Sequence, residues 1–176
     1  MSTNEGPIYY CVDRTDTIVE IGGSWDRFAE MSGAMDLFAH KVIGTGLLSH
    51  ISGDVTQSFV AAALDAARVL NARRVMPYRC DAPRFKRFME MKVEPVPSGL
   101  LRVSHRLIRT ERFPYELNFK ASATGGSPTV RCSLCGRISG ADGWLEPEEA
   151  SLLGLVRTGD VNQVIYTVCE PCKSVR

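Results

Sequence analysis

The chain has 176 residues, of which 44% are hydrophobic and 23% are charged, as in folded globular proteins. These values exclude a coiled coil, a collagen-like repeat and an intrinsically disordered chain. The 21 Lys and Arg residues nearly balance the 20 Asp and Glu residues, so the net charge of +1 gives no global attraction to nucleic acid or to an anionic membrane. Without a signal-peptide pattern or an apolar run of about 18 residues, we expect a cytoplasmic protein with no membrane partner.

Strands and short helices are predicted for the first 50 residues. Residues 8–13 and 17–22 are β-rich runs separated by a polar turn, which predicts a β-hairpin. Ser24 is a suitable N-cap for a short helix that follows. Residues 42–51 are too short and too rich in glycine for more than one or two helical turns.

The longest predicted helix has Asp54 as its N-cap and ends near Asn71. Apolar residues recur along it at intervals of three and four, which predicts one buried stripe made of Val55, Phe59, Ala62, Ala63, Ala66 and Leu70. Three extended segments follow, at 73–80, 85–96 and 100–108, and a Pro-Ser-Gly turn joins the last two.

Three stretches of residues 8–109 carry a resemblance to a known family. They are VDRTDTIVEIGGSWDRFAE at the predicted hairpin and first helix, VIGTGLLSHI before the long helix, and the closing strands MPYRCDAPRFKRFMEMKVEPVPSGLLRVSHRLI. Together they resemble a PAS domain. The resemblance implies an α+β fold, with helices packed on one face of a five-stranded antiparallel sheet. It also implies a sensor or interaction module that binds a small ligand or a partner and has no reaction of its own.

Six residues are candidates for lining a ligand pocket in this PAS-like part: Trp25, Phe59, Tyr78, Met89, Met91 and His105. Alternation along residues 100–108 puts His105 on the face of Leu101, Val103 and Leu107, either as a ligand-binding group or as a satisfied core histidine. Met89 and Met91 alternate with charged residues, so they face inward, in an adaptable pocket or in plain core.

Haem, flavin and catalysis are not expected. Residues 54–71 hold no histidine for haem, and neither CxxC pair continues into the CxxCH motif of covalent haem. The sequence SHISGD before the long helix differs from the Asn-Cys-Arg motif of flavin-binding light sensors. No P-loop, GxGxxG, GxSxG or HExxH motif is present, and no paired nucleophile and base, so we expect no enzyme.

The segment 79–87, RCDAPRFKR, concentrates charge between two predicted strands. Strand alternation favours a solvated rim with one or two exposed ion pairs, and a basic contact patch is the alternative.

A linker is predicted at residues 111–128, because their second half is small, polar and rich in Gly, Ser and Pro. It would separate a PAS-like domain at 1–110 from a cysteine module at 129–176. Within the module, Pro147 starts a predicted helix and residues 164–168 read as a strand.

Two CxxC pairs give the strongest chemical signal in the chain: Cys132 with Cys135, and Cys169 with Cys172. Zinc prefers four tetrahedral ligands, and each CxxC turn supplies two thiolates on one side of such a tetrahedron. The pairs therefore predict a structural zinc site in a small zinc-ribbon-like module. The other two cysteines, Cys11 and Cys80, stand alone in apolar surroundings.

The module also resembles a cysteine-rich tail at the C-terminus of many bacterial sensor and response-regulator proteins. The matching residues are Cys132, Cys135, Arg137, Ile138, Gly143, Trp144, Cys169 and Cys172. Tyr166 and Thr167 replace the histidine and glycine of that tail, so a histidine role is not expected.

Two alternative functions remain open for the module. A nucleic-acid-binding regulator would need basic and aromatic residues near the cysteines, whereas residues 141–150 are acidic, so nucleic acid is not the expected partner. A thiol redox switch would need a CxxC at a helix N-terminus in a βαβ context, which neither pair has. The sequence thus favours a non-catalytic signalling protein with a protein partner and structural zinc. The resemblance to PAS domains implies a homodimer in addition.

Overall fold

The computed structural model describes residues 7–122 and 128–174. The chain forms two compact units, each built from segments that are separated in the sequence. The first unit lies within Met1–Ile51, Val60–Met76 and Glu90–Leu107. The second unit lies within Ser52–Phe59, Pro77–Met89 and Ile108–Arg176.

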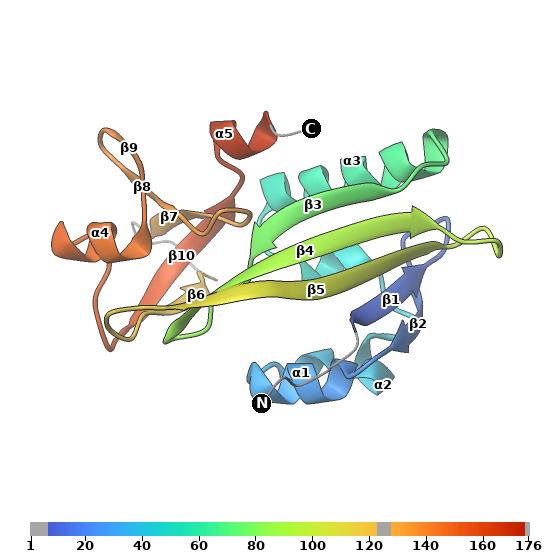
Figure 1. Ribbon diagram of the computed structural model, residues 1–176, viewed down its shortest axis with the longest axis horizontal. Helices are drawn as coiled ribbons and strands as arrows, with labels where there is room; N and C mark the ends of the chain where they lie inside the picture. Colours follow the sequence, from blue (N-terminus) through green and yellow to red (C-terminus); the bar gives the residue numbers. More distant parts are fainter. Residues whose placement is uncertain (1–6, 123–127, 175–176) are drawn as a thin grey trace. The chain divides into compact units, whose positions relative to one another are not determined.

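A five-stranded antiparallel sheet has the strand order β2-β1-β5-β4-β3 (Figure 1). Its strands are β1 (Ile8–Val12), β2 (Ile18–Gly22), β3 (Arg74–Arg79), β4 (Phe85–Pro95) and β5 (Leu101–Arg112). The predicted α+β fold with this sheet is confirmed. The other strands differ from their predicted bounds by one residue at one or both ends, and the largest difference is in β5, which continues to Arg112, beyond the predicted end at residue 108.

Helices connect β2 to β3, as predicted: α1 (Trp25–Met31), η1 (Met35–Leu37), α2 (Ala39–Val42), η2 (Leu47–His50) and α3 (Asp54–Val69). One predicted cap, Ser24, is confirmed in its position, and the other, Asp54, is wrong. Ser24 stands at the N-cap of α1 without a side-chain capping hydrogen bond. Asp54 is the first residue of α3, and the Gly53 carbonyl accepts the amide of Gln57, so Gly53 is the N-cap.

The buried stripe of α3 differs from the predicted one. The buried residues are Thr56, Val60, Leu64 and Ala67, whereas Val55 and Leu70 of the predicted stripe are exposed. Both sets follow helical spacing, so periodicity alone could not choose between them. In the first unit, Leu64 and Ala67 are buried, as are Tyr10, Val12, Leu101 and Val103 of the sheet.

The second unit holds a mixed sheet in the order β6-β10-β7-β8-β9. Its elements are β6 (Asn118–Ala121), β7 (Thr129–Cys132), β8 (Ile138–Gly140), β9 (Gly143–Leu145), α4 (Pro147–Leu152), β10 (Val161–Thr167) and α5 (Glu170–Lys173). β10 runs parallel to both β6 and β7, while β7, β8 and β9 are antiparallel. A zinc-ribbon fold is not shown by this arrangement.

Part of the predicted linker belongs to the core of the second unit. Phe113 and Leu117 are buried in a cluster with Ile138, Ala150 and Val156. The hydrophobic effect favours burial of these aromatic and aliphatic side chains, although the segment that follows them is polar. The predicted domain boundaries remain a prediction, and residues 123–127 of the expected linker lie outside the described residues.

Within the described residues, no helix is long and apolar enough to cross a membrane.

Core packing of α3 can be tested with a matched pair of substitutions on one helix. Leu64 is 1% exposed, so Leu64→Ala should lower the free energy of unfolding by about 2–5 kcal/mol through lost burial and a cavity. Val69 is 82% exposed, so Val69→Ala should change it by less than about 0.5 kcal/mol. Urea denaturation measures both, and equal effects would contradict this assignment of the buried face.

Candidate metal centre

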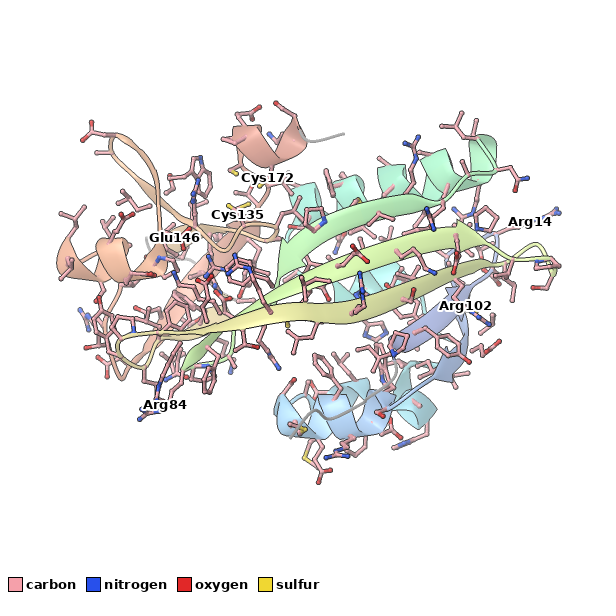
Figure 2. The ribbon with its side chains drawn as sticks, in the orientation of Figure 1. Arg14, Arg84, Arg102, Cys135, Glu146 and Cys172 are labelled. Atoms are coloured by element: carbon pink, nitrogen blue, oxygen red, sulfur yellow. The ribbon has the colours of Figure 1, made fainter. Side chains whose placement is uncertain are left out.

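Parallel pairing of β7 with β10 brings the two CxxC pairs together. Cys132 ends β7 and lies opposite Thr167 of β10, so Cys169 follows at the same end of the neighbouring strand. The four sulfur atoms of Cys132, Cys135, Cys169 and Cys172 lie within 4.8 Å of one another. Figure 2 shows Cys135 and Cys172 close together. The structure thus unites the two pairs that the sequence singled out.

The sulfur spacing fits a tetrahedral thiolate site. Sulfur atoms at about 2.3 Å from a central zinc ion would be about 3.8 Å apart. The Sγ atoms of Cys135 and Cys169 are 3.8 Å apart. Cys132 and Cys169 are buried, while Cys135 and Cys172 are half-buried. Four soft sulfur ligands favour zinc or iron over magnesium or calcium.

Backbone amides stabilise negative charge on one of these sulfurs. The pKa of Cys132 is lowered to about 4, chiefly by a hydrogen bond from the Cys135 thiol and also by the amides of Cys135, Cys169 and Leu134, while burial acts in the opposite direction. The amide of Cys169 lies 3.4 Å from the Cys132 sulfur. The amides around Cys132 therefore favour the thiolate form of this residue.

Gly136 allows the first CxxC turn to close. It has a φ of +72°, in the left-handed region, and its amide donates to the Cys132 carbonyl over 3.0 Å. A Cβ atom there would lie 2.9 Å from the Nε of Arg79 and 3.2 Å from a carboxylate oxygen of Asp81. Both conformation and space thus require glycine directly after Cys135.

The first CxxC turn is also bonded to the beginning of α3, within the second unit. Ser133 and Thr56 share a hydrogen bond between their hydroxyl groups, and the Ser133 amide donates to the Thr167 carbonyl over 2.8 Å. Gly53, with a φ of +90°, leaves no room for a Cβ atom, which would lie 2.4 Å from the Tyr166 carbonyl oxygen. These contacts join three segments, which are the first CxxC turn, the beginning of α3 and the end of β10. Together they fix the backbone around Cys132 and Cys135.

A buried ion-pair network lies beside the same turn. Asp81 is 2% exposed and accepts two hydrogen bonds from Arg79, at 3.1 and 2.7 Å, and one from Arg131 at 2.6 Å. Arg131 donates to the Gly136 carbonyl, and the Arg79 amide donates to the Leu134 carbonyl. Two cations share one carboxylate while also holding the backbone of the CxxC turn.

Glu146 extends the network to α4. Its carboxylate accepts from Arg79 at 2.8 Å, from Lys86 at 3.3 Å and from Arg137 at 3.1 Å (Figure 2). Burial alone would raise the pKa of Glu146, but the hydrogen bonds and positive charges of Arg79, Arg137 and Lys86 outweigh it and lower the pKa. Glu146 also forms a capping box with Glu149 at the start of α4.

The prediction of a solvated rim at residues 79–87 is therefore wrong for Arg79 and Lys86. Arg79 and Lys86 are buried, because their partners Asp81, Glu146 and Glu148 surround them with acceptors. Glu146 and Glu148 lie at least 60 residues away in the sequence, which strand alternation cannot reveal.

Removing the central carboxylate should destabilise the second unit strongly. Asp81→Ala would leave Arg79 and Arg131 buried without their shared acceptor, at a cost of about 3–5 kcal/mol. Asp142 is exposed, so Asp142→Ala is the matched control and should cost less than about 0.5 kcal/mol. Denaturation followed by tryptophan fluorescence measures both, and a small effect of Asp81→Ala would contradict a structural role for the network.

The predicted ligand-pocket residues divide between the two units. Trp25, Met91 and His105 belong to the first unit, and Phe59, Tyr78 and Met89 belong to the second. Tyr10, which the sequence analysis did not select, contacts two of them: its ring centroid is 5.9 Å from that of Trp25 and 5.6 Å from that of His105. Tyr10 lies in a predicted strand, and the sequence pattern of that strand indicates a core residue without indicating a ligand site. The ligand role of all six remains a prediction.

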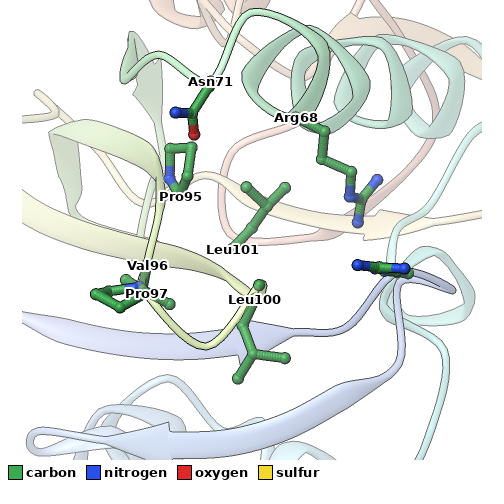
Figure 3. A pocket seen from close by; sticks show the side chains of 9 residues that line it. Arg68, Asn71, Pro95, Val96, Pro97, Leu100 and Leu101 are labelled. Atoms are coloured by element: carbon green, nitrogen blue, oxygen red, sulfur yellow. The ribbon is translucent and has the colours of Figure 1, made fainter.

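A cavity of about 660 Å³ in the first unit has other walls (Figure 3). The β1–β2 turn, the end of α3 and the β4–β5 turn line it, and the residues are Arg14, Arg68, Asn71, Pro95, Val96, Pro97, Gly99, Leu100 and Leu101. Arg68 is bound to Asp16 and to the Asp13 carbonyl, so its charge is already neutralised. None of the six predicted pocket residues lines this cavity.

Shielding of His105 predicts a pH dependence of stability. Burial lowers its pKa to about 4, while an unfolded histidine titrates near 6.5. Between these values the unfolded chain binds a proton that the folded chain does not, so stability should fall by up to about 3 kcal/mol as the pH drops from 6.5 to 4. His105→Gln should remove this part of the slope while the carboxylates keep theirs. Denaturation at several pH values gives the slope of the free energy of unfolding against pH for both chains. The same slope for the unchanged chain and for His105→Gln would contradict the shielding of His105.

Comparisons with known proteins give a limited likeness. Neither a protein-family model nor a curated protein matches this chain. Two solved structures of the PAS domain of the RpfR quorum-sensing receptor from Cronobacter turicensis, in complex with BDSF and with C12:0, are similar to part of it. Each is 14% identical, has a TM-score of 0.46, and covers 62% of this chain and 100% of the RpfR domain.

Proposed function

We propose that the chain is a non-catalytic signalling protein, in which a PAS-like sheet that binds a small ligand or a protein partner is joined to a structural zinc centre. Cys132, Cys135, Cys169 and Cys172 would hold the zinc. The observation that carries the proposal is the convergence of these four sulfur atoms within 4.8 Å, at the spacing of a tetrahedral site.

A structural role suits the zinc better than a catalytic one. All four ligands come from the protein, whereas catalytic zinc sites keep one position for water or substrate. The bound ion would neutralise the thiolates and link the end of β7 to the end of β10. Zinc coordination would thus add to the hydrogen bonds and ion pairs that already hold this end of the sheet.

The sensing role rests on the antiparallel sheet and on the aromatic cluster of Tyr10, Trp25 and His105 in the first unit. Tyr10 is 6% exposed, and desolvation by burial raises its pKa. Tyr10, Trp25 and His105 combine apolar rings with groups able to donate or accept hydrogen bonds, which is the composition of small-ligand sites. A bound ligand would act on a partner by binding two arrangements of this unit with different affinity.

Native mass spectrometry of the full chain, compared with its denatured mass, tests both parts of the proposal. One zinc ion adds about 65 Da, whereas iron would add about 56 Da. Cys135→Ser should abolish the zinc excess, because three thiolates bind zinc much more weakly, and Cys80→Ser is the matched control that should keep it. Any further mass excess of the native protein that is lost on denaturation would give the mass of a ligand bound to the PAS-like unit.

Two other results would contradict the proposed zinc site. A native chain without metal, whose cysteines form disulfides in the purified protein, would overturn the zinc centre and favour a thiol redox switch. A chain that retains zinc after Cys135→Ser would show that the metal is held elsewhere.

A further inference from the structure

The last part of β5 is an exposed strand segment. Residues 108–112, which belong to the second unit, are all exposed, and Ile108 is 49% exposed. The sheet neighbours of β5 are β4 and β1, but β1 pairs only with residues 101–105. Among residues 7–122 and 128–174, no strand therefore pairs with the other edge of 108–112. Such an edge presents backbone N–H and C=O groups to a further strand.

The sequence of this edge, Ile-Arg-Thr-Glu-Arg, is complementary to itself. When two copies run antiparallel about Thr110, Arg109 lies opposite Glu111 of the partner subunit, and this pair occurs twice. Thr110 then lies opposite Thr110 of the partner subunit. Opposite charges and threonine pairs placed directly across an antiparallel ladder are stabilising, whereas like charges are destabilising.

Other registers do not share this complementarity. Pairing centred on Arg109 places two arginines opposite each other, and pairing centred on Glu111 places two glutamates there. A centre between Thr110 and Glu111 sets Arg109 against Arg112 of the partner subunit. Charge alone therefore selects the register centred on Thr110.

Contacts within one chain already prepare this edge. Arg109 forms an ion pair with Glu111 on the same face of β5, and its guanidinium lies 3.5 Å from the ring centroid of Phe88 on the neighbouring strand β4. The two charges are thus held side by side before a second copy arrives. Pairing would give four charges on one face of the joined strands, two on each strand, with each charge next to the opposite sign along its own strand and across the pair.

We propose that this edge is a homodimer interface, in which residues 108–112 of two copies pair antiparallel about a twofold axis at Thr110. The same patch serves both subunits, as twofold symmetry requires. The segment is short, so the dimer is weak, with a dissociation constant on the order of 100 μM. It uses neither the four cysteines nor the aromatic cluster, so its success or failure is independent of the zinc centre and of ligand binding.

Sedimentation velocity of the full chain, as purified, from about 10 μM to about 1 mM, tests the interface. Arg109→Glu should raise the dissociation constant about tenfold or more, because each substitution enters the symmetric interface twice. Glu111→Arg should do the same. The double variant with Arg109→Glu and Glu111→Arg restores opposite charges and should restore the dimer. Arg157→Glu, an equal charge change at an exposed residue outside the edge, should leave it unchanged.

A second measurement identifies the pairing directly. In a mixture of isotope-labelled and unlabelled chains, contacts between Thr110 of the two copies should appear in a filtered NMR spectrum. A chain that stays monomeric at about 1 mM overturns the proposal, since this exceeds the expected dissociation constant about tenfold. A dimer that ignores the single charge reversals, or that the double variant does not restore, also overturns it.

Discussion

The second unit depends on the parallel pairing of β7 with β10. This register places two strand ends side by side, and with them two CxxC pairs that are separated by a helix and three strands in the sequence. A shift of one residue would turn the side chains of Cys132 and its neighbours to the other face of the sheet. The hydrogen bonds of Ser133, the glycine at position 136 and the ion pairs of Asp81 all act on this one place.

The charged network and the cysteine cluster complement each other. Thiolates and buried carboxylates both cost free energy in a protein interior unless donors or cations surround them. Here Arg79 and Arg131 bind Asp81, while the amides of the CxxC turn point at Cys132. The result is a small region with many formal charges, in which Arg131 binds Asp81 and Arg79 binds Glu146 across large separations in the sequence.

Local patterns in the sequence predicted the elements better than their partners. Alternation and turn residues located β1 to β5, and the proline at 147 located α4, because these signals are set by neighbours in the chain. β6 to β9 were not predicted, since three- and four-residue strands carry too few alternations. The cysteine site was predictable because metal ligands must be particular residues. The buried role of Arg79 was not, because Glu146 and Arg131 approach it only in the folded chain.

The second unit is discontinuous: it takes Ser52–Phe59 and Pro77–Met89 from the middle of the chain and completes them with residues from 108 onward. During synthesis, the early segments leave the ribosome long before the strand that carries Cys169. Contacts of such large sequence separation form late and slowly. The hydrogen bond between Thr56 and Ser133 therefore forms only after the segment that carries Ser133 has been made, and the four sulfur atoms converge only after Cys172 has been made.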